Sequence, residues 1–154
     1  MADSNSQGPR FTTTLRRRLF KAPNFEAFVE ENAALLTPMK ISDYLAELRE
    51  KSGFSVGQIV IRCNIDRNYF HQLLNGTRHP SRDKLIQLAF GFGLDVDGTQ
   101  ELLKIAQMSA LYPRIVRDAA ILRCLHDGKR FDETQELLSQ MGLTLLDGED
   151  KKNA

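Results

Sequence analysis

The sequence lacks the features that would place it in a secreted, metal-stabilised or membrane-spanning class. It holds only two cysteines in 154 residues, Cys63 and Cys124, and no tryptophan. Neither cysteine belongs to a CxxC pair or a Cys/His cluster, which argues against a zinc finger and against a disulfide-stapled secreted domain. No apolar run approaches the roughly 18–20 residues needed to span a bilayer. A chain of this length can bury enough surface to fold without disulfides or a metal.

Net charge is nearly absent, since 21 basic residues are balanced by 20 acidic ones to give +1. This excludes a protein that binds polyanions through bulk charge. The positive charge is concentrated in residues 55–84, where five basic side chains outnumber two acidic ones and the net charge is +3. The five basic residues are Arg62, Arg67, Arg78, Arg82 and Lys84. The sequence therefore predicts a local basic surface.

Signs of catalysis or of a bound cofactor are also lacking. The three histidines, His71, His79 and His126, have no HExxH or related metal-ligand spacing. No glycine-rich phosphate loop occurs, because the triplet at 91–93 has the pattern of a helix end. Neither cysteine has the sequence context of a nucleophile. We therefore expect no enzymatic activity, no metal site and no other cofactor.

Hydrophobic spacing predicts an all-α chain. Residues 1–22 are polar and basic and are predicted to form a disordered tail. Helices are predicted over residues 25–36, from 41 to Gly53, after an N-cap at Ser55, from an N-cap at Asp66 to Asn75-Gly76, from Ser81 to Gly93, and from Asp97 onward. The run LRRRLF at 15–20 is followed by glutamates rather than by an apolar segment. We therefore expect a cytoplasmic protein and not an exported one.

An internal duplication is visible when the sequence is shifted by 35 residues, which aligns 81–111 with 116–146. The block TQELL occurs at 99–103 and again at 134–138. In each copy one helix ends at glycine and a second begins with Asp-x-x-Gln, which is similar to a capping box. A two-helix unit cannot bury its apolar face alone, so the second copy should pack on the first or on a partner chain. Its use stays open between a dimer surface and a platform for an effector or partner.

The most informative stretch is residues 55–81, SVGQIVIRCNIDRNYFHQLLNGTRHPS. It holds two short helices joined at Asn64-Ile65, and the second begins with polar residues. The stretch resembles the Cro/repressor-type (Xre-type) helix-turn-helix of lambda-repressor-like domains, and the resemblance extends over roughly 39–106. It is carried by the run YFHQLLNGTRHPS from Tyr69 to Ser81, which follows the family pattern aromatic-aliphatic-x-x-aliphatic-x-Asn-Gly-x-Arg-x-Pro-Ser.

The resemblance implies an all-α, lambda-repressor-like domain of five helices with additions at both ends. The chain would then consist of a tail at 1–22, an N-terminal helix at 23–38, the helix-turn-helix domain at 39–111, a C-terminal helix pair at 112–147 and a second flexible tail at 148–154.

The resemblance also implies binding to double-stranded DNA, with the second helix in the major groove, which is about 12 Å wide and admits one helix. An arginine there can pair with guanine, and an asparagine or glutamine with adenine. The candidate base contacts are Arg67, Asn68, His71 and Gln72. The candidate phosphate contacts are Ser55, Asn75, Thr77 and Arg78.

Two positions, Val56 and Val60, depart from the family pattern and favour weaker or altered DNA binding. Val56 stands where the family has a glutamine that braces a base reader, Gly57 follows it, and Val60 replaces a small residue between the two helices. The first hypothesis is a sequence-specific transcriptional regulator of the bacterial or phage repressor kind, acting as a homodimer on a two-fold site. The alternative is a protein-interaction module or antitoxin-like adaptor. It would bind a partner through its C-terminal, duplicated helix pairs and the helix at 25–36, and it would bind DNA weakly or not at all.

Overall fold

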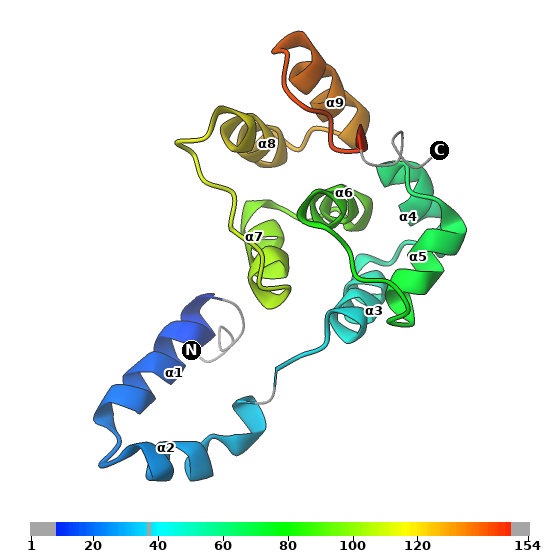
Figure 1. Ribbon diagram of the computed structural model, residues 1–154. Helices are drawn as coiled ribbons and strands as arrows, with labels where there is room; N and C mark the ends of the chain where they lie inside the picture. The colour runs from blue at the N-terminus through cyan, green and yellow to red at the C-terminus, as the bar shows by residue number, and fades with distance from the viewer. Residues whose placement is uncertain (1–8, 37, 149–154) are drawn as a thin grey trace. The chain divides into compact units, whose positions relative to one another are not determined.

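The computed structural model describes residues 9–36 and 38–148, which hold nine α-helices, one short 3-10 helix and no strand (Figure 1). This confirms the all-α class predicted from the hydrophobic spacing. The chain divides between Met39 and Lys40 into two compact units. The first unit contains α1 (Pro9–Lys21), α2 (Phe25–Glu31) and the 3-10 helix η2 (Ala33–Leu35).

Helix α1 differs from the disordered tail predicted for this part of the sequence, and that prediction is wrong for residues 9–21. Pro9 stands at the first position of the helix, where its fixed φ is favourable and its missing N–H costs nothing. Leu15 and Leu19 lie one turn apart and are both half-buried. Helix α1 packs on α2, and Arg18 donates a hydrogen bond of 3.2 Å to the Asn32 side chain. The outer parts of the two predicted tails, 1–8 and 149–154, lie outside the described residues.

The second unit contains the remaining seven helices around one core. They are α3 (Ile41–Ser52), α4 (Val56–Cys63), α5 (Arg67–Leu74), α6 (Arg82–Phe92), α7 (Val96–Ile105), α8 (Val116–His126) and α9 (Phe131–Gln140). Helix α6 is central, because every residue from Lys84 to Phe92 is buried and the helix contacts α3, α4, α7 and α9. The C-terminal helix pair thus shares the core of the domain that precedes it.

Most helix ends in this unit follow the local chemistry expected from the sequence. Ser55, Asp66 and Ser81 each accept a hydrogen bond from the backbone N–H three residues later. Gly53 and Gly93 end their helices in the left-handed conformation, with φ of 74° and 72°. Glycine is favoured there because it has no β-carbon to clash.

The starts of α7 and α9 differ from prediction by two residues. Asp95 caps α7 by accepting from the Gly98 N–H, and Asp97 lies inside the first turn. Arg130 stands at the N-cap of α9, and Asp132 again lies inside the first turn. The Asp-x-x-Gln pattern is therefore not a capping box in either copy, and its glutamine has another role, described below.

The duplication seen in the sequence is also present in the structure. A shift of 35 residues brings α6 onto α8 within one residue and α7 onto α9. The helix-ending glycines Gly93 and Gly128 both have positive φ, 72° and 70°. The N–H that follows each glycine donates to an equivalent carbonyl at 2.9 Å, from Leu94 to Ala89 and from Lys129 to Cys124.

A single glycine sets how closely α4 approaches the central helix. A β-carbon at Gly91 would lie 2.8 Å from the Cys63 Sγ and 3.1 Å from the Ile59 carbonyl oxygen. Distances this short are not tolerated between packed atoms. The absence of a side chain at Gly91 therefore allows α4 to lie directly on α6, and α4 in turn supports α5.

Candidate nucleic-acid interface

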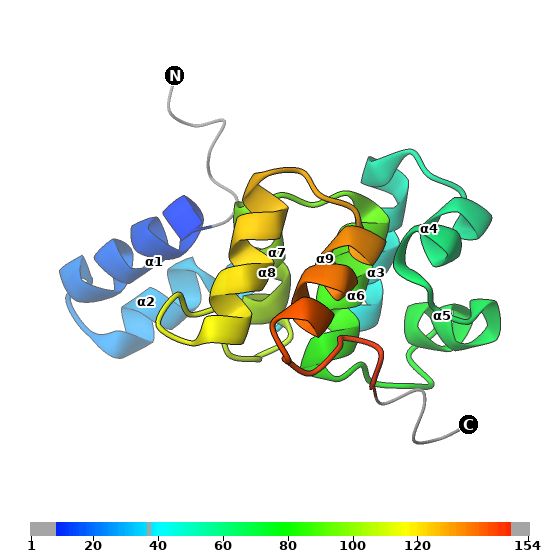
Figure 2. The ribbon, with the colours of Figure 1, turned by 90° about the horizontal axis from the view of Figure 1, so that it is seen from above.

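Helix α5 lies at the rim of the second unit, and α6 lies between it and α8 in both ribbon views (Figures 1 and 2). Its inward side chains Phe70 and Leu73 are fully buried, and Leu74 is half-buried. Its outward side chains are the four predicted base contacts: Arg67, Asn68 and His71 are exposed, and Gln72 is half-buried. The C-terminal helices thus leave the polar edge of α5 open to solvent.

The turn that joins α4 to α5 is tight and anchored at both ends. Asn64 ends α4 in the left-handed conformation, with φ 55° and ψ 47°. The next residue, Ile65, is buried, and its N–H donates to the Val60 carbonyl at 3.1 Å. Asp66 then starts α5 by accepting from the Tyr69 N–H at 3.0 Å. Asparagine tolerates this conformation better than most residues, which explains how three residues suffice to connect the two helices.

A buried polar network supports this turn from below. The Gln87 side chain donates to the Cys63 carbonyl at the end of α4 over 2.9 Å, and the Lys84 ammonium donates to the Gln87 Oε1 over 3.1 Å. The Lys84 Nζ also lies 5.6 Å from the centre of the Tyr69 ring on α5. The network therefore links α4, α5 and the central helix, and it leaves the buried Cys63 carbonyl satisfied.

Arg67 lies back across the first turn of α4. A β-carbon built at Gly57 would stand 3.0 Å from the Arg67 Nη2, and 3.8 Å from the Ser55 Oγ. Gly57, which follows Val56, thus makes room for the guanidinium. Arg67 approaches the start of α4 instead of pointing straight out from α5.

The predicted phosphate contacts lie at the two ends of this helix pair. Ser55 is exposed, but its N–H is bound by the Gln58 side chain and its hydroxyl accepts the Gln58 N–H, a complete capping box. Asn75 likewise uses its side-chain oxygen to accept the Thr77 N–H at 2.8 Å. The side chains of Thr77 and Arg78 are exposed. Ser55 and Asn75 therefore use part of their hydrogen-bonding capacity within the protein, and fewer of their polar groups are available to a phosphate than the sequence alone indicates.

The basic surface predicted for residues 55–84 is smaller than its charge count. Lys84 is buried. Arg82 forms an ion pair with Asp118 at 2.9 Å. Arg62 stacks on Phe54, 4.3 Å from the ring centre, and its guanidinium donates to carbonyls at the end of α6. Arg67 and Arg78 are exposed beside α5, and the Arg78 guanidinium lies over the Tyr69 ring, 5.6 Å from its centre.

Residues 41–102 match the family model of a helix-turn-helix domain. The match begins at α3 and ends within α7, so the helix-turn-helix domain includes α4 and α5 as its central pair. No curated protein and no solved structure matches the chain.

Three residues that support the helix-turn-helix were not singled out from the sequence. Lys84, Gln87 and Gly91 lie on the central helix, far along the chain from the turn that they hold. A lysine and a glutamine at core positions of a helix are the only signal the sequence offers. The capping box at Ser55 and Gln58 could have been found, because Ser-x-x-Gln is its standard pattern.

A groove of about 830 Å³ separates the helix-turn-helix from the C-terminal helix pair. On one side it is lined by Ile61 on α4 and by Asn64, which follows α4. On the other side it is lined by the loop before α9 and by the first turn of α9. Asp147 is among its lining residues, and its carboxylate accepts from Asn64 at 3.4 Å and from Gln135 at 2.8 Å. Within the part of the chain that the structure describes, no cluster of three or more His, Cys, Asp or Glu could hold a metal ion. None of the described helices is both long and apolar enough to cross a bilayer.

Proposed function

We propose that the chain is a sequence-specific DNA-binding transcriptional regulator of the Xre type, which places α5 in the major groove. The observation that carries the proposal is the exposed polar edge of α5 within the matched helix-turn-helix domain. The rigidity of α5 supports the proposal. Gln87 and Lys84 hold the turn before α5, and the inward side chains of α5 are fully buried. A rigid scaffold is what a base-reading helix requires.

In this proposal the side chains at the start of α5 read bases. Asn68 is placed to pair with adenine and Arg67 with guanine, once the guanidinium leaves Gly57. His71 and Gln72 follow one turn later, where they reach either a base or the adjoining phosphate. Thr77, Arg78, Asn75 and the start of α4 at Ser55 bind the phosphate backbone on either side of the groove.

The sparse charge beside α5 favours a dimer. With Arg67 and Arg78 as the exposed arginines of α5 and of the turn after it, one chain neutralises few phosphates, and each neutralised phosphate contributes only about −0.9 to the slope of log affinity against log salt. Two chains on a two-fold site, with half-sites about one helical turn apart, double that contribution.

The test is a titration of a fluorescent duplex at several salt concentrations with two variants of matched chemistry. Arg78→Ala removes an arginine beside α5, whereas Arg123→Ala removes one on α8 that pairs with Asp127. The proposal expects Arg78→Ala to weaken binding to every duplex and to reduce the salt slope by about one per chain. It expects Arg123→Ala to leave both unchanged. Equal effects of the two variants would refute the placement of the DNA.

A second candidate function, binding of a protein partner, is favoured by apolar side chains of the first unit. Phe20 and Phe25 are 75% and 65% exposed, and Val29, Leu35 and Leu36 are also exposed. In this second candidate function, these side chains form the surface that contacts the partner. The discriminating experiment removes residues 1–39 and compares DNA affinity with binding of a purified candidate partner. Loss of partner binding with unchanged DNA affinity supports this second function.

A further inference from the structure

The two copies of the duplicated helix pair contact each other reciprocally. Arg82 at the start of α6 pairs with Asp118 on α8 at 2.9 Å. Arg117 at the start of α8 pairs with Asp83 on α6 at 3.0 Å. Since Arg82 corresponds to Arg117 and Asp83 to Asp118, each ion pair is the other one with the two copies interchanged. All four side chains are at least half-buried, which strengthens the pairing relative to a surface ion pair.

The same arginines bind the chain in equivalent ways. The Arg82 Nε donates to the Ser109 carbonyl at 2.8 Å, and the Arg117 Nε donates to the Thr144 carbonyl at 2.8 Å. Ser109 and Thr144 are themselves 35 residues apart. Each arginine therefore joins the end of its own copy to an aspartate of the other copy.

The glutamines of the repeated TQELL block provide a third equivalence. Gln100 accepts from the Leu111 N–H at 2.7 Å, and Gln135 accepts from the Leu146 N–H at 2.8 Å. These bonds fold the segment after each helix pair back onto its second helix and bury both leucines. In both copies, the segment after the helix pair is therefore held against the second helix in the same way.

This arrangement is that of a two-fold dimer contained within one chain. Helix α6 contacts α9 as α8 contacts α7, which is the pattern of a self-complementary, isologous interface. The same contacts can therefore form between the α6–α7 pair of one chain and the α8–α9 pair of a second chain. No contact has to be redesigned for the exchange, because the interface is the same in both cases.

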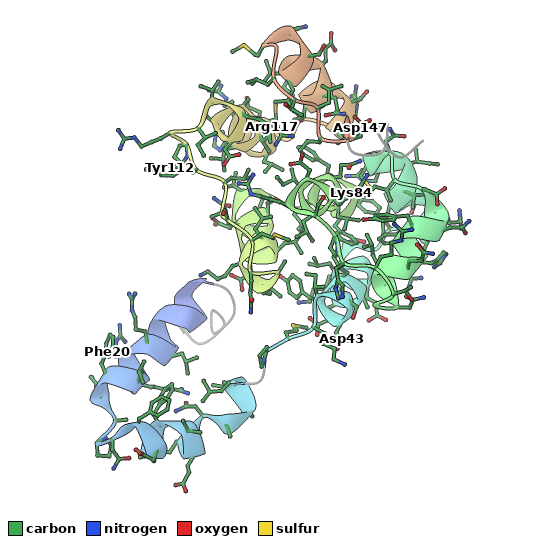
Figure 3. All side chains as sticks on the ribbon, in the orientation of Figure 1. Phe20, Asp43, Lys84, Tyr112, Arg117 and Asp147 are labelled. Carbon is green, nitrogen blue, oxygen red and sulfur yellow. The ribbon has the colours of Figure 1, made fainter. Side chains whose placement is uncertain are left out.

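The segment that joins the copies has the properties of a hinge for such an exchange. It runs over the surface between α7 and α8, and Tyr112 stands at the outer edge of the unit (Figure 3). Tyr112, Ile115 and Val116 are 51%, 51% and 61% exposed. In an exchanged dimer, two such segments cross beside the new two-fold axis, where the apolar side chains of one chain can cover those of the other.

We propose that the chain dimerises by exchanging its α8–α9 pair, so that the helix pair of each chain packs on the α6–α7 pair of the other. The partner is a second copy of this chain. The exchange leaves α5 exposed, since α8 and α9 pack on α7, α6 and α4. Its biological purpose rests on the proposed function, because it joins two recognition helices in one particle. The dimer itself does not depend on DNA.

The experiment uses two full-length variants with complementary charge reversals. Variant A carries Arg82→Asp with Asp83→Arg, and variant B carries Arg117→Asp with Asp118→Arg. Within either chain alone, like charges meet at both ion pairs. When α8–α9 is exchanged between A and B, α6 of B meets α8 of A, and both original ion pairs form. At the other interface, α6 of A meets α8 of B, and both ion pairs form with their charges reversed. Both interfaces are therefore complementary. A chain with all four changes is the control, because it restores complementarity within a single chain.

The measurement is mass by analytical ultracentrifugation, with thermal unfolding in parallel and no DNA present. The expected result is a 1:1 complex of A and B of twice the monomer mass, more stable than either variant alone, and a wild-type dimer at the same concentration. If either variant alone does not fold, co-expression of A and B with different affinity tags gives the same comparison, and the expected result is joint recovery in equal amounts. Separate monomers of A and B, or a wild-type chain that stays monomeric at all concentrations, would overturn the exchange. Neither outcome bears on whether α5 binds DNA, which the titration above tests independently.

Discussion

The guanidinium of Arg67 lies over Gly57, so near that a β-carbon on the glycine would stand 3.0 Å from Nη2. Arg67 is the first residue of α5, and Gly57 lies in the first turn of α4. A glycine in a helix costs about 0.5–1 kcal/mol relative to alanine. The space that it leaves determines where the predicted guanine reader rests before DNA binds.

Gly57→Ala should therefore change DNA binding without weakening the fold. We expect the free energy of unfolding to stay the same or to rise by up to about 1 kcal/mol, because alanine favours a helix and Arg67 is flexible enough to move. DNA affinity should change, since Arg67 is displaced. The measurement is a double-mutant cycle with Arg67→Ala. In the Arg67→Ala background the glycine substitution should have no further effect on affinity, and an undiminished effect there would contradict the link.

Gly91→Ala should have the opposite effect on stability. Its β-carbon would meet the Cys63 Sγ at 2.8 Å and backbone at 3.1 Å, and backbone cannot move aside cheaply. We expect a loss of about 1–3 kcal/mol in the free energy of unfolding, as for other overpacked cores. Urea denaturation measures it, with Gly57→Ala as the matched glycine control in the opposing helix. A Gly91→Ala protein as stable as that control would show that α4 and α6 are not in close contact.

Gln87→Leu tests the buried network under the turn. The substitution keeps a similar volume but removes the donor to the Cys63 carbonyl and the acceptor for the Lys84 ammonium. Leaving a buried polar group without its partner costs about 1–3 kcal/mol, and more when the group is charged. We expect a loss of at least that size in denaturation experiments, whereas Gln140→Leu at the exposed end of α9 should change little. Equal stability of the two variants would contradict a stabilising role for this buried network.

Stability should fall in alkaline solution because of a buried thiol. Burial raises the pKa of the Cys63 thiol from 9.0 to about 12, and its Sγ–H donates to the Ile59 carbonyl at 3.1 Å. Between pH 9 and about pH 12, the Cys63 thiol is deprotonated in the unfolded chain and still protonated in the folded chain. The free energy of unfolding therefore decreases by up to about 1.4 kcal/mol per pH unit from this group.

Denaturation at a series of pH values checks this, with Cys63→Ala expected to show a shallower decline above pH 9. Part of the decline should remain in that variant, because burial, together with the charges of Glu101 and Glu47, also raises the pKa of Tyr44. An identical decline in both proteins would contradict the assignment to Cys63.

The helix-turn-helix could be predicted from the sequence because its signals are local. Ser55, Asp66 and Ser81 cap helices, Gly53 and Gly93 end them, and each acts within three or four residues. The exposed edge of α5 followed from the spacing of its two fully buried residues, Phe70 and Leu73. Such features depend on the neighbouring sequence and little else.

The basic surface could not be predicted, because charge counts ignore partners that are distant in the chain. Arg82 is paired with Asp118, 36 residues away, and Arg62 binds carbonyls 28 and 29 residues away. The role of Gln100 was misassigned for the same reason, since it binds Leu111 and not the start of its own helix. Helix α1 differs from the predicted tail because its few apolar side chains, Leu15 and Leu19, share one face, and the helix packs on α2.

The most direct test of α5 as the DNA-reading helix is selection of bound duplexes from a random-sequence library by the full-length protein. The same selection is carried out with Asn68→Ala and with Arg123→Ala as the control. We expect an enriched site of two related half-sites about one helical turn apart. We also expect Asn68→Ala to lose the preference at a single position of each half-site, with affinity for the wild-type site reduced by about 1–3 kcal/mol. An unenriched library, or the same preferred sequence from wild type and Asn68→Ala, would contradict α5 as the DNA-reading helix.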